Sequence, residues 1–325
     1  MDRRRGLPRA SGMETAAFLI DVFLPNVAKG PIIRRPKAVA LAERLGLDDR
    51  AVRRVKKLAG KYRAGPLLLR LPFREQAVIL QSGHLHYALI NSPEPFSPAS
   101  SEKKAALSHF EPRNVLISQG PERTVRRALQ EQVLDTHSPV HRLASSPIPV
   151  IRQEAAQLLA DLDPKGTAEN SELVWDDFIE SWYRVVRRTV FGDSARDDHE
   201  LTDMIARLRQ HGNWSFLKAP DRKLRARFLQ RVQNRMDGAE PGSLAHAMVN
   251  LPSRQDAPAE QIPQWLFAFD PAGMATFRTL ALLSTHSEQY GRAQTEIREE
   301  TTGREQLPYL RACVLESLRL CPPRR

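Results

Sequence analysis

The sequence has little cysteine and few aromatic residues. Only two cysteines occur, Cys313 and Cys321, and both lie near the end of the chain. Two cysteines in these positions give neither a disulfide framework nor a paired zinc-ligand spacing. The cysteine content therefore predicts a protein of a reducing compartment.

Long apolar runs are also lacking. The stretch Ala16–Leu24 follows a basic leader, but Asp21 interrupts it and Pro25 ends it, so we expect no export signal. No segment reaches the ~18 uninterrupted apolar residues that a membrane-spanning helix needs. We expect a cytoplasmic protein without a membrane span.

Acidic residues are scarce relative to basic ones. The chain holds 49 Lys and Arg against 38 Asp and Glu, which leaves a formal charge of +11. Such a surface attracts anionic partners, which include nucleic acid, acidic lipid and acidic electron-carrier proteins. The hydrophobic content of 41% is that of an ordinary globular protein, so we expect a folded chain rather than a disordered one.

Apolar residues recur mainly at helical spacing. This periodicity predicts helices over Ala38–Leu47, Arg50–Lys61, Val150–Leu162, Trp175–Val190, Leu201–Gln210 and Leu224–Met236. Two early apolar runs, Pro66–Leu71 and Gln76–Leu80, are joined by a short link that suits a β-hairpin. The sequence predicts a mainly α fold with a small β-sheet.

The composition of the loops indicates no domain boundary. Pro- and Ser-rich segments fall at Asn91–Glu102, His137–Pro149 and Leu251–Pro263, each between periodic segments of similar composition. There is no internal repeat and no low-complexity tract. We expect one domain over residues 1–325.

A long, largely apolar segment, Gln264–Ser284, predicts a buried helix that contains the run Ala272–Thr276. Gly273 and Thr276 are spaced three apart on one face, where small residues would let a flat ligand approach the backbone. Pro271 removes one helical hydrogen bond and predicts a kink beside Thr276. The alternative is that Gly273 marks close helix packing and that the Thr276 hydroxyl bonds to a carbonyl of its own helix.

A second helix is predicted over Leu307–Leu320, because proline stands in its first turn and Pro322 and Pro323 follow its end. Glu316 and Arg319 lie three apart within it, so they share a face and can form a charge-assisted pair. Pairs of this kind are common on helix surfaces and contribute little by themselves.

The two segments together resemble the cytochromes P450. A central helix with an AGxxT motif is followed about forty residues later by an ExxR helix that runs into Leu-Cys-Pro-Pro. The resemblance implies a P450 fold in which Ala272, Gly273 and Thr276 line the distal haem face. It also implies that Glu316 and Arg319 anchor the core beneath the haem, and that Ala268 faces substrate.

The resemblance extends weakly toward the amino terminus. Arg123 and Arg127 occupy the places where bacterial members use His and Arg on the haem propionates, and Phe96 falls in the equivalent of a substrate-recognition loop. Two guanidinium groups four residues apart on a helix can bind carboxylates, although a solvated basic face fits the same residues. The family implies haem b, a ferredoxin or flavoprotein reductase supplied by NAD(P)H, and oxygen insertion into a small apolar substrate.

Two departures from the family pattern bear on activity. The thiolate that ligates P450 iron belongs to a glycine-rich loop beyond the ExxR helix, and neither Cys313 nor Cys321 matches that loop. We therefore expect a P450 fold whose C-terminal part is missing, and an inactive fragment. Ala275 stands where many members carry an acid that helps to pass protons, so Thr276 would act with water alone.

Two other classes of function stay open. Residues 40–57 resemble a helix-turn-helix with a basic second helix, which would indicate DNA binding. A haem-free helical remnant or scaffold is the second alternative. His84 and His86 stand two apart without a third ligand, so we assign no metal site.

Overall fold

The computed structural model describes residues 6–30, 32–63, 65–163, 172–215, 217–251, 258–299 and 307–320. These residues form two compact units, one up to Ser100 (unit 1) and one from Ser101 onward (unit 2), and each is described by itself. The expectation of one domain over residues 1–325 stays a prediction. No helix of the described residues is long and apolar enough to cross a membrane.

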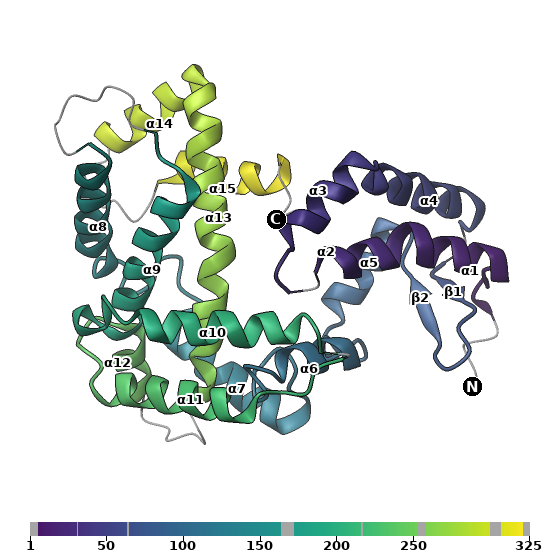
Figure 1. Cartoon of the computed structure of the whole chain (residues 1–325), viewed down its shortest axis with the longest axis horizontal. Helices are drawn as coiled ribbons and strands as arrows, with labels where there is room; N and C mark the ends of the chain where they lie inside the picture. The colour runs from purple at the N-terminus through teal and green to yellow at the C-terminus, as the bar shows by residue number, and fades with distance from the viewer. Residues whose placement is uncertain are drawn as a thin grey trace. The chain divides into compact units, whose positions relative to one another are not determined.

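Unit 1 combines short helices with a two-stranded sheet (Figure 1). A capping box between Ser11 and Glu14 starts the first helix, and Ala10, Leu58 and Leu67 lie in the buried core. Its elements in order are α1 (Gly12–Phe18), the π-helix η2 (Leu19–Phe23), α2 (Leu24–Lys29), α3 (Pro36–Arg44), α4 (Leu47–Lys61), β1 (Leu67–Leu69), β2 (Gln76–Val78) and α5 (Ser82–Ile90).

The predicted hairpin is confirmed. Strand β1 pairs antiparallel with β2, with Leu67 opposite Val78 and Leu69 opposite Gln76. Each strand is shorter than its apolar run. Leu67 and Leu69 are buried and Leu68 is only partly buried, which is the alternation of a sheet with one face on a core.

Unit 2 is helical. The helices predicted from periodicity are confirmed in both units, each within a few residues of its expected bounds. Its elements are α6 (Ser101–Leu107), α7 (Gly120–Val133), α8 (Pro147–Leu162), α9 (Trp175–Phe191), the 3₁₀ turn η3 (Asp193–Ala195), α10 (His199–Gly212), α11 (Arg222–Asp237), α12 (Leu244–Val249), the 3₁₀ turn η4 (Pro258–Gln261), α13 (Pro263–Thr285), α14 (Ser287–Glu299) and α15 (Pro308–Leu320).

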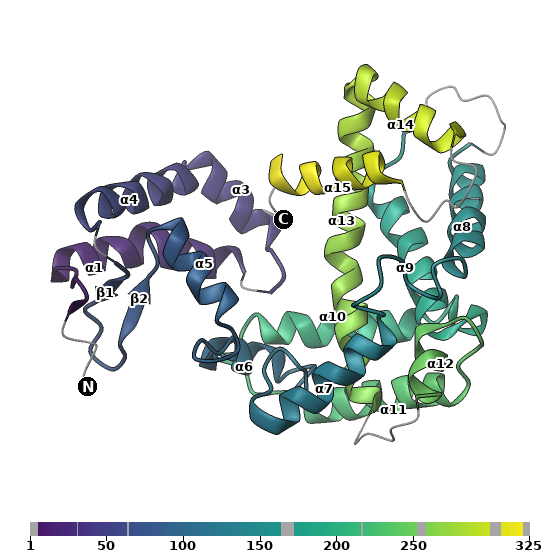
Figure 2. The same cartoon turned by 180° about the vertical axis from the view of Figure 1, so that it is seen from behind.

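Local sequence explains where many of these helices begin. Proline stands in the first turn of α7, α8 and α13, where its missing N–H leaves no bond unmade. The side chains of Asp198, Asp221 and Ser243 accept backbone N–H groups at the starts of α10, α11 and α12. Helix α13 is the long helix of unit 2, and it contacts both α9 and α15 (Figures 1 and 2).

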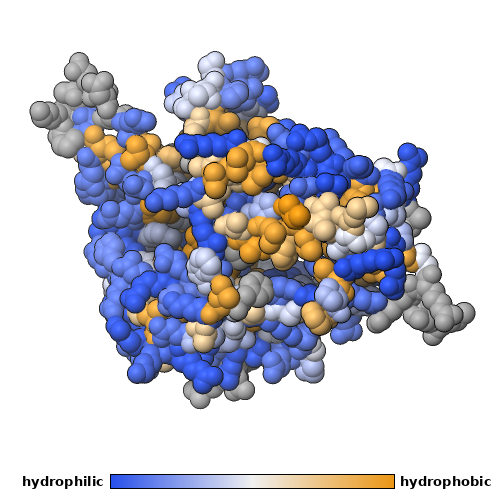
Figure 3. Space-filling view, turned by 45° about the vertical axis from the view of Figure 1, so that its right-hand side comes forward, coloured by the Kyte–Doolittle hydropathy of each residue, from blue (hydrophilic) through white to orange (hydrophobic). Residues whose placement is uncertain are grey.

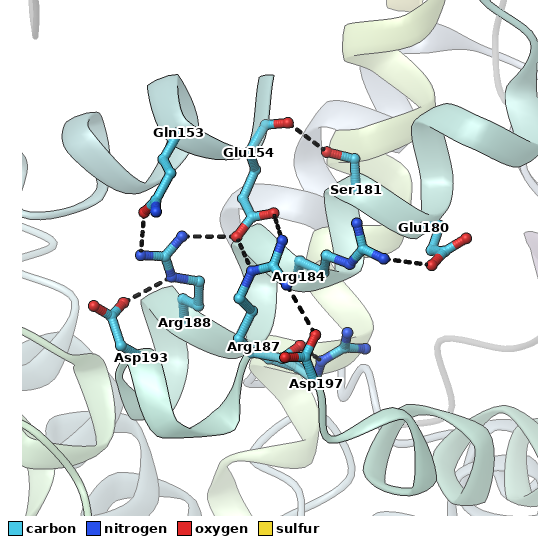
Figure 4. Close-up of polar contacts among 10 residues, drawn as sticks. Gln153, Glu154, Glu180, Ser181, Arg184, Arg187, Arg188, Asp193 and Asp197 are labelled. Carbon is cyan, nitrogen blue, oxygen red and sulfur yellow. Dashed lines mark hydrogen bonds and ion pairs between the residues drawn. The ribbon is translucent and has the colours of Figure 1, made fainter. Parts of the chain in front are cut away.

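A buried carboxylate joins α8 to α9. Glu154 is 1% exposed, and it accepts hydrogen bonds from Arg188 Nη1 at 2.7 Å and from Arg196 Nε and Nη2 at 2.7 and 2.9 Å. Arg188 also donates to Gln153 and Asp193, as Figure 4 shows. Each guanidinium nitrogen of Arg188 and Arg196 donates to an acceptor, which is the condition under which a buried ion pair is tolerated.

Replacing the buried carboxylate tests its contribution to stability. We expect Glu154→Gln to lower the free energy of unfolding by up to about 3–5 kcal/mol, because the buried Arg188 would keep only the exposed Asp193 as a counter-charge. Denaturant titration measures the change. The control is Glu180→Gln, which removes a partner from an exposed pair with Arg184 and should cost under about 1 kcal/mol. Equal losses in the two variants would contradict the prediction.

Candidate functional site

One side of α13 carries a row of small side chains. Ala268 and Ala272 are exposed and Thr276 is half-buried, at a spacing of four that places them on one helix face. The Thr276 hydroxyl donates to the carbonyl oxygen of Ala272 at 2.9 Å. These three residues, called the small-residue strip below, present methyl groups and one hydroxyl group, and that hydroxyl is bonded within its own helix.

Gly273 faces a neighbouring helix. A Cβ added there would lie 2.8 Å from Nε1 and 2.9 Å from Cδ1 of Trp182 on α9, closer than real Cβ atoms approach other atoms. The Trp182 Nε1–H donates to the carbonyl oxygen of Phe269 at 3.0 Å. Gly273 therefore allows the close packing of α13 on α9. Close helix packing is the alternative role that the sequence left open for this glycine.

Helix α13 runs continuously through Pro271, and the residue before this proline anchors it. Asp270 accepts a hydrogen bond from Tyr183 Oη at 2.9 Å and pairs with Arg209 on α10. Burial and the neighbouring Asp270 charge raise the pKa of Tyr183 above its usual range. The Arg209 guanidinium lies 4.9 Å from the ring centroid of Phe267. The proline segment is thus tied to both α9 and α10.

Glu111, a buried acid near the start of α13, was not predicted from the sequence. Glu111 is 1% exposed, its Oε2 accepts from Asn114, and its Oε1 has no hydrogen-bond partner among the described residues. Asn114 also donates to Gln264 Oε1 of α13 at 2.5 Å. Burial raises the pKa of Glu111 to about 8. Nothing in the sequence around Glu111, between His109 and Asn114, indicates that its carboxyl group is buried.

The two predicted propionate ligands differ in their surroundings. Arg127 is exposed, and its Nε donates to Glu131 at 2.5 Å. Arg123 is half-buried, and its Nε has no partner among the described residues. Burial and the Arg123 charge lower the pKa of Lys103. Arg123 thus lies in a cationic neighbourhood with one donor unused.

Helix α7 is fixed to α13 at its other end. The Nε1–H of the buried Trp265 donates to Gln130 Oε1 at 2.6 Å. With a rise of about 1.5 Å per residue, Arg127 lies about 4.5 Å and Arg123 about 10 Å along α7 from this contact. Both arginines are therefore carried by a helix that is anchored on the start of α13.

On α15 the predicted Glu316–Arg319 pair forms. Arg319 Nε and Nη2 donate to Glu316 Oε2 and Oε1 at 2.8 and 2.6 Å, and half or more of each side chain is exposed. The Arg319 bond lowers the pKa of Glu316. The buried contact of α15 with α13 is made by Ser317, whose Oγ accepts from Thr279 Oγ1 at 3.1 Å. Cys313 is partly buried within α15.

Residues predicted for substrate binding fall in different units. Phe96 belongs to unit 1, is 42% exposed and contacts the Tyr87 ring edge-to-face at 5.9 Å, whereas Ala268 belongs to unit 2. Ala275 is buried, and its carbonyl oxygen lies 3.5 Å from Ser317 Oγ. Cys321 lies outside the described residues.

The segment that resembles a helix-turn-helix forms two helices, α3 and α4, around Gly46, whose φ is +59°. Part of its basic face is used within unit 1. Arg54 pairs with Asp21 at 2.7 Å. This pair explains one cation of the segment without a nucleic-acid partner.

Comparison with known proteins gives a match by structure alone. No protein-family model and no curated protein matches the sequence. The retinoic acid-bound structure of cyanobacterial CYP120A1, a cytochrome P450, superimposes with a TM-score of 0.59 at 18% sequence identity. The fold is P450-like. The match covers 82% of this chain and 64% of that one, so the chain spans less than two thirds of the length of this neighbour.

The P450-like fold confirms the prediction of a mainly helical chain with a small sheet. It assigns no role to Thr276, Glu316 or Arg123, which stay predictions. Neither the DNA-binding nor the scaffold alternative receives support from the comparisons.

The packing role of Gly273 can be measured. We expect Gly273→Ala to lower the free energy of unfolding by about 1–3 kcal/mol, because the added methyl group overlaps Trp182. The matched control is Gly291→Ala on α14, where nothing lies within 4 Å of the new Cβ and helix propensity should add about 0.5–1 kcal/mol of stability. A stabilised Gly273→Ala protein in denaturant titration would show that the close approach does not exist.

Glu111 makes stability depend on pH. Its folded pKa of about 8 lies above its ordinary value, so its stabilising effect is complete at low pH and is lost as pH rises through 8. We expect the free energy of unfolding to fall by up to about 1.4 kcal/mol per pH unit between pH 4.5 and 8 from this group. Glu111→Gln should remove that slope in denaturant titrations at stepped pH. An unchanged slope would mean that Glu111 is already ionised in the folded chain.

Proposed function

We propose that this chain is a haem protein of the cytochrome P450 type, whose complete activity is oxygen insertion into a small apolar substrate. The observation that carries the proposal is the P450-like fold together with the small-residue strip on α13. A cytoplasmic location belongs to the same proposal. Retinoic acid, the ligand named for the structural neighbour, is mainly apolar, which agrees with the proposed substrate class.

Two features of the described residues fit haem b. The strip formed by Ala268, Ala272 and Thr276 carries no large side chain and is mostly apolar, as the face of a porphyrin requires. Arg123 carries a buried Nε–H without a partner, and a propionate would supply the missing acceptor. Arg127 would join it by exchanging Glu131 for the second propionate. When bound, haem supplies the iron at which dioxygen is activated.

Other residues would act around this group. Thr276 Oγ1 now donates to Ala272, and rotation about its χ1 angle would direct the hydroxyl toward water and let it relay a proton. Ala268 and Phe96 would contact substrate, and Glu316 with Arg319 would brace the core. The positive net charge suits an acidic ferredoxin, or a flavoprotein reductase supplied by NAD(P)H.

Haem titration tests the proposal. We expect saturable binding with a Soret band, and we expect Arg123→Gln to weaken it about tenfold or more, because a charge-assisted bond contributes about 1.5–3 kcal/mol. The matched control is Arg227→Gln on α11, an exposed arginine whose ion pair among the described residues is with Glu200, which should leave binding unchanged. Absence of saturable binding, or equal affinity of the Arg123→Gln protein, would refute haem binding at this site.

The same sample tests the cysteines. We predict that neither Cys313 nor Cys321 ligates iron, so reduced protein with carbon monoxide should lack the red-shifted Soret band of a thiolate complex. If that band appears, Cys313→Ser identifies whether the helix cysteine is the ligand.

A further inference from the structure

A cavity of about 260 Å³ lies between α9 and α10 of unit 2. Tyr183 and Arg187 line it from α9, and His199, Thr202 and Asp203 line it from the first turns of α10. The volume is below the range of drug-sized pockets, so any ligand is small. The small-residue strip and the predicted haem ligands are not among its walls.

Arg187 is the unusual member of this cavity. It is 1% exposed, its Nε donates to the carbonyl oxygen of Arg196 at 2.7 Å, and its Nη1 donates to Thr202 Oγ1 at 3.1 Å. Both acceptors are neutral. Nη2 has no partner, and no ion pair to this guanidinium exists within the described part of the chain. A buried cation with neutral acceptors and an unused donor leaves its desolvation uncompensated.

Nearby carboxylates do not neutralise Arg187. Asp198 is bonded to Arg231 and Arg235 at 2.7 Å each, and Asp197 pairs with Arg196. Burial lowers the pKa of Arg187, and the charges of Asp198 and Asp197 offset only part of this effect. The N-terminal turn of α10, which begins at His199, adds a partial positive charge to the same cavity.

The outer walls have the opposite sign. Glu180 and Asp203 line the cavity and are exposed, and of these two Glu180 already pairs with Arg184. A phosphate or another multiply charged anion would meet repulsion there. A ligand with one negative charge at its inner end and a positive charge at its outer end matches both parts.

We propose that this cavity binds a small zwitterion of the amino-acid class, with its carboxylate at Arg187 and its ammonium group at Asp203. The carboxylate supplies the missing counter-charge, and a rotation of the guanidinium would turn the buried Nη2 toward it as a donor. The proposal is independent of haem binding, because it uses none of the residues assigned to that group.

Binding of 4-aminobutyrate, with butyrate as a probe that lacks the ammonium group, tests the proposal by saturation-transfer NMR and calorimetry. We expect 4-aminobutyrate to bind about two- to fivefold more tightly than butyrate, since an exposed ion pair contributes about 0.2–1 kcal/mol. Arg187→Gln should weaken both probes about tenfold or more. The control Arg227→Gln should change neither.

The Asp203→Asn variant should fold like the unmodified chain, because Asp203 is exposed. It should keep butyrate affinity and abolish the preference for 4-aminobutyrate, even if the Arg187→Gln protein does not fold. Failure of both probes to bind at about 50 mM would overturn the proposal, as would unchanged affinity in a folded Arg187→Gln protein. Equal affinity of the two probes for the unmodified chain would overturn the assignment to a zwitterion.

Discussion

The absence of a side chain at Gly273 determines how the centre of unit 2 is built. It lets α13 approach α9 until the Trp182 indole lies against the backbone, where the ring bonds to the Phe269 carbonyl oxygen and stacks on Phe178 at 5.8 Å. The buried side of α13 is occupied by this contact. Its small-residue strip is not part of this contact, and Figure 3 shows apolar side chains gathered on one exposed face of the molecule.

Helix α15 is held by its buried contact with α13 and by Glu296 of α14, which accepts from the Tyr309 and Leu310 N–H groups at 2.7 and 2.9 Å, rather than by its Glu316–Arg319 pair. The Thr279–Ser317 hydrogen bond is buried, whereas the Glu316–Arg319 pair is bidentate but solvated and contributes little to stability. What the exposed pair does provide is orientation, since two bonds fix both side chains. A further charged group could bind to it without first separating the ions.

The sequence predicts those parts of the fold whose signals are local. Proline boundaries and a long apolar period identify α13 and α15, and two Leu- and Val-containing runs identify the hairpin. Periodicity does not predict a helix at the interrupted apolar stretch 16–24, although this stretch forms helices around the π-helix η2. The Gly273–Trp182 contact and the burial of Glu111 depend on residues far apart in the chain, which periodicity cannot pair.

For the candidate site, too, the sequence predicts the helices but not the exposure of their side chains. The motif spacing placed Thr276 and Glu316 on helices, but their exposure depends on which neighbours cover them. Arg187 shows the same limit of prediction. Its place in a helix follows from local sequence, whereas its lack of a counter-charge depends on tertiary packing.

Arg231 and Arg235 share the buried Asp198, one on each oxygen, and each donates through Nε. Lysine has no counterpart to this Nε, because its charge is a single point at the end of a flexible stem. Exchanging either arginine for lysine would leave the net charge of the chain unaltered and still loosen α11 from the start of α10. Formal charge therefore understates what these two positions require: the planar guanidinium groups hold Asp198, and a positive sign alone would not hold it in the same way.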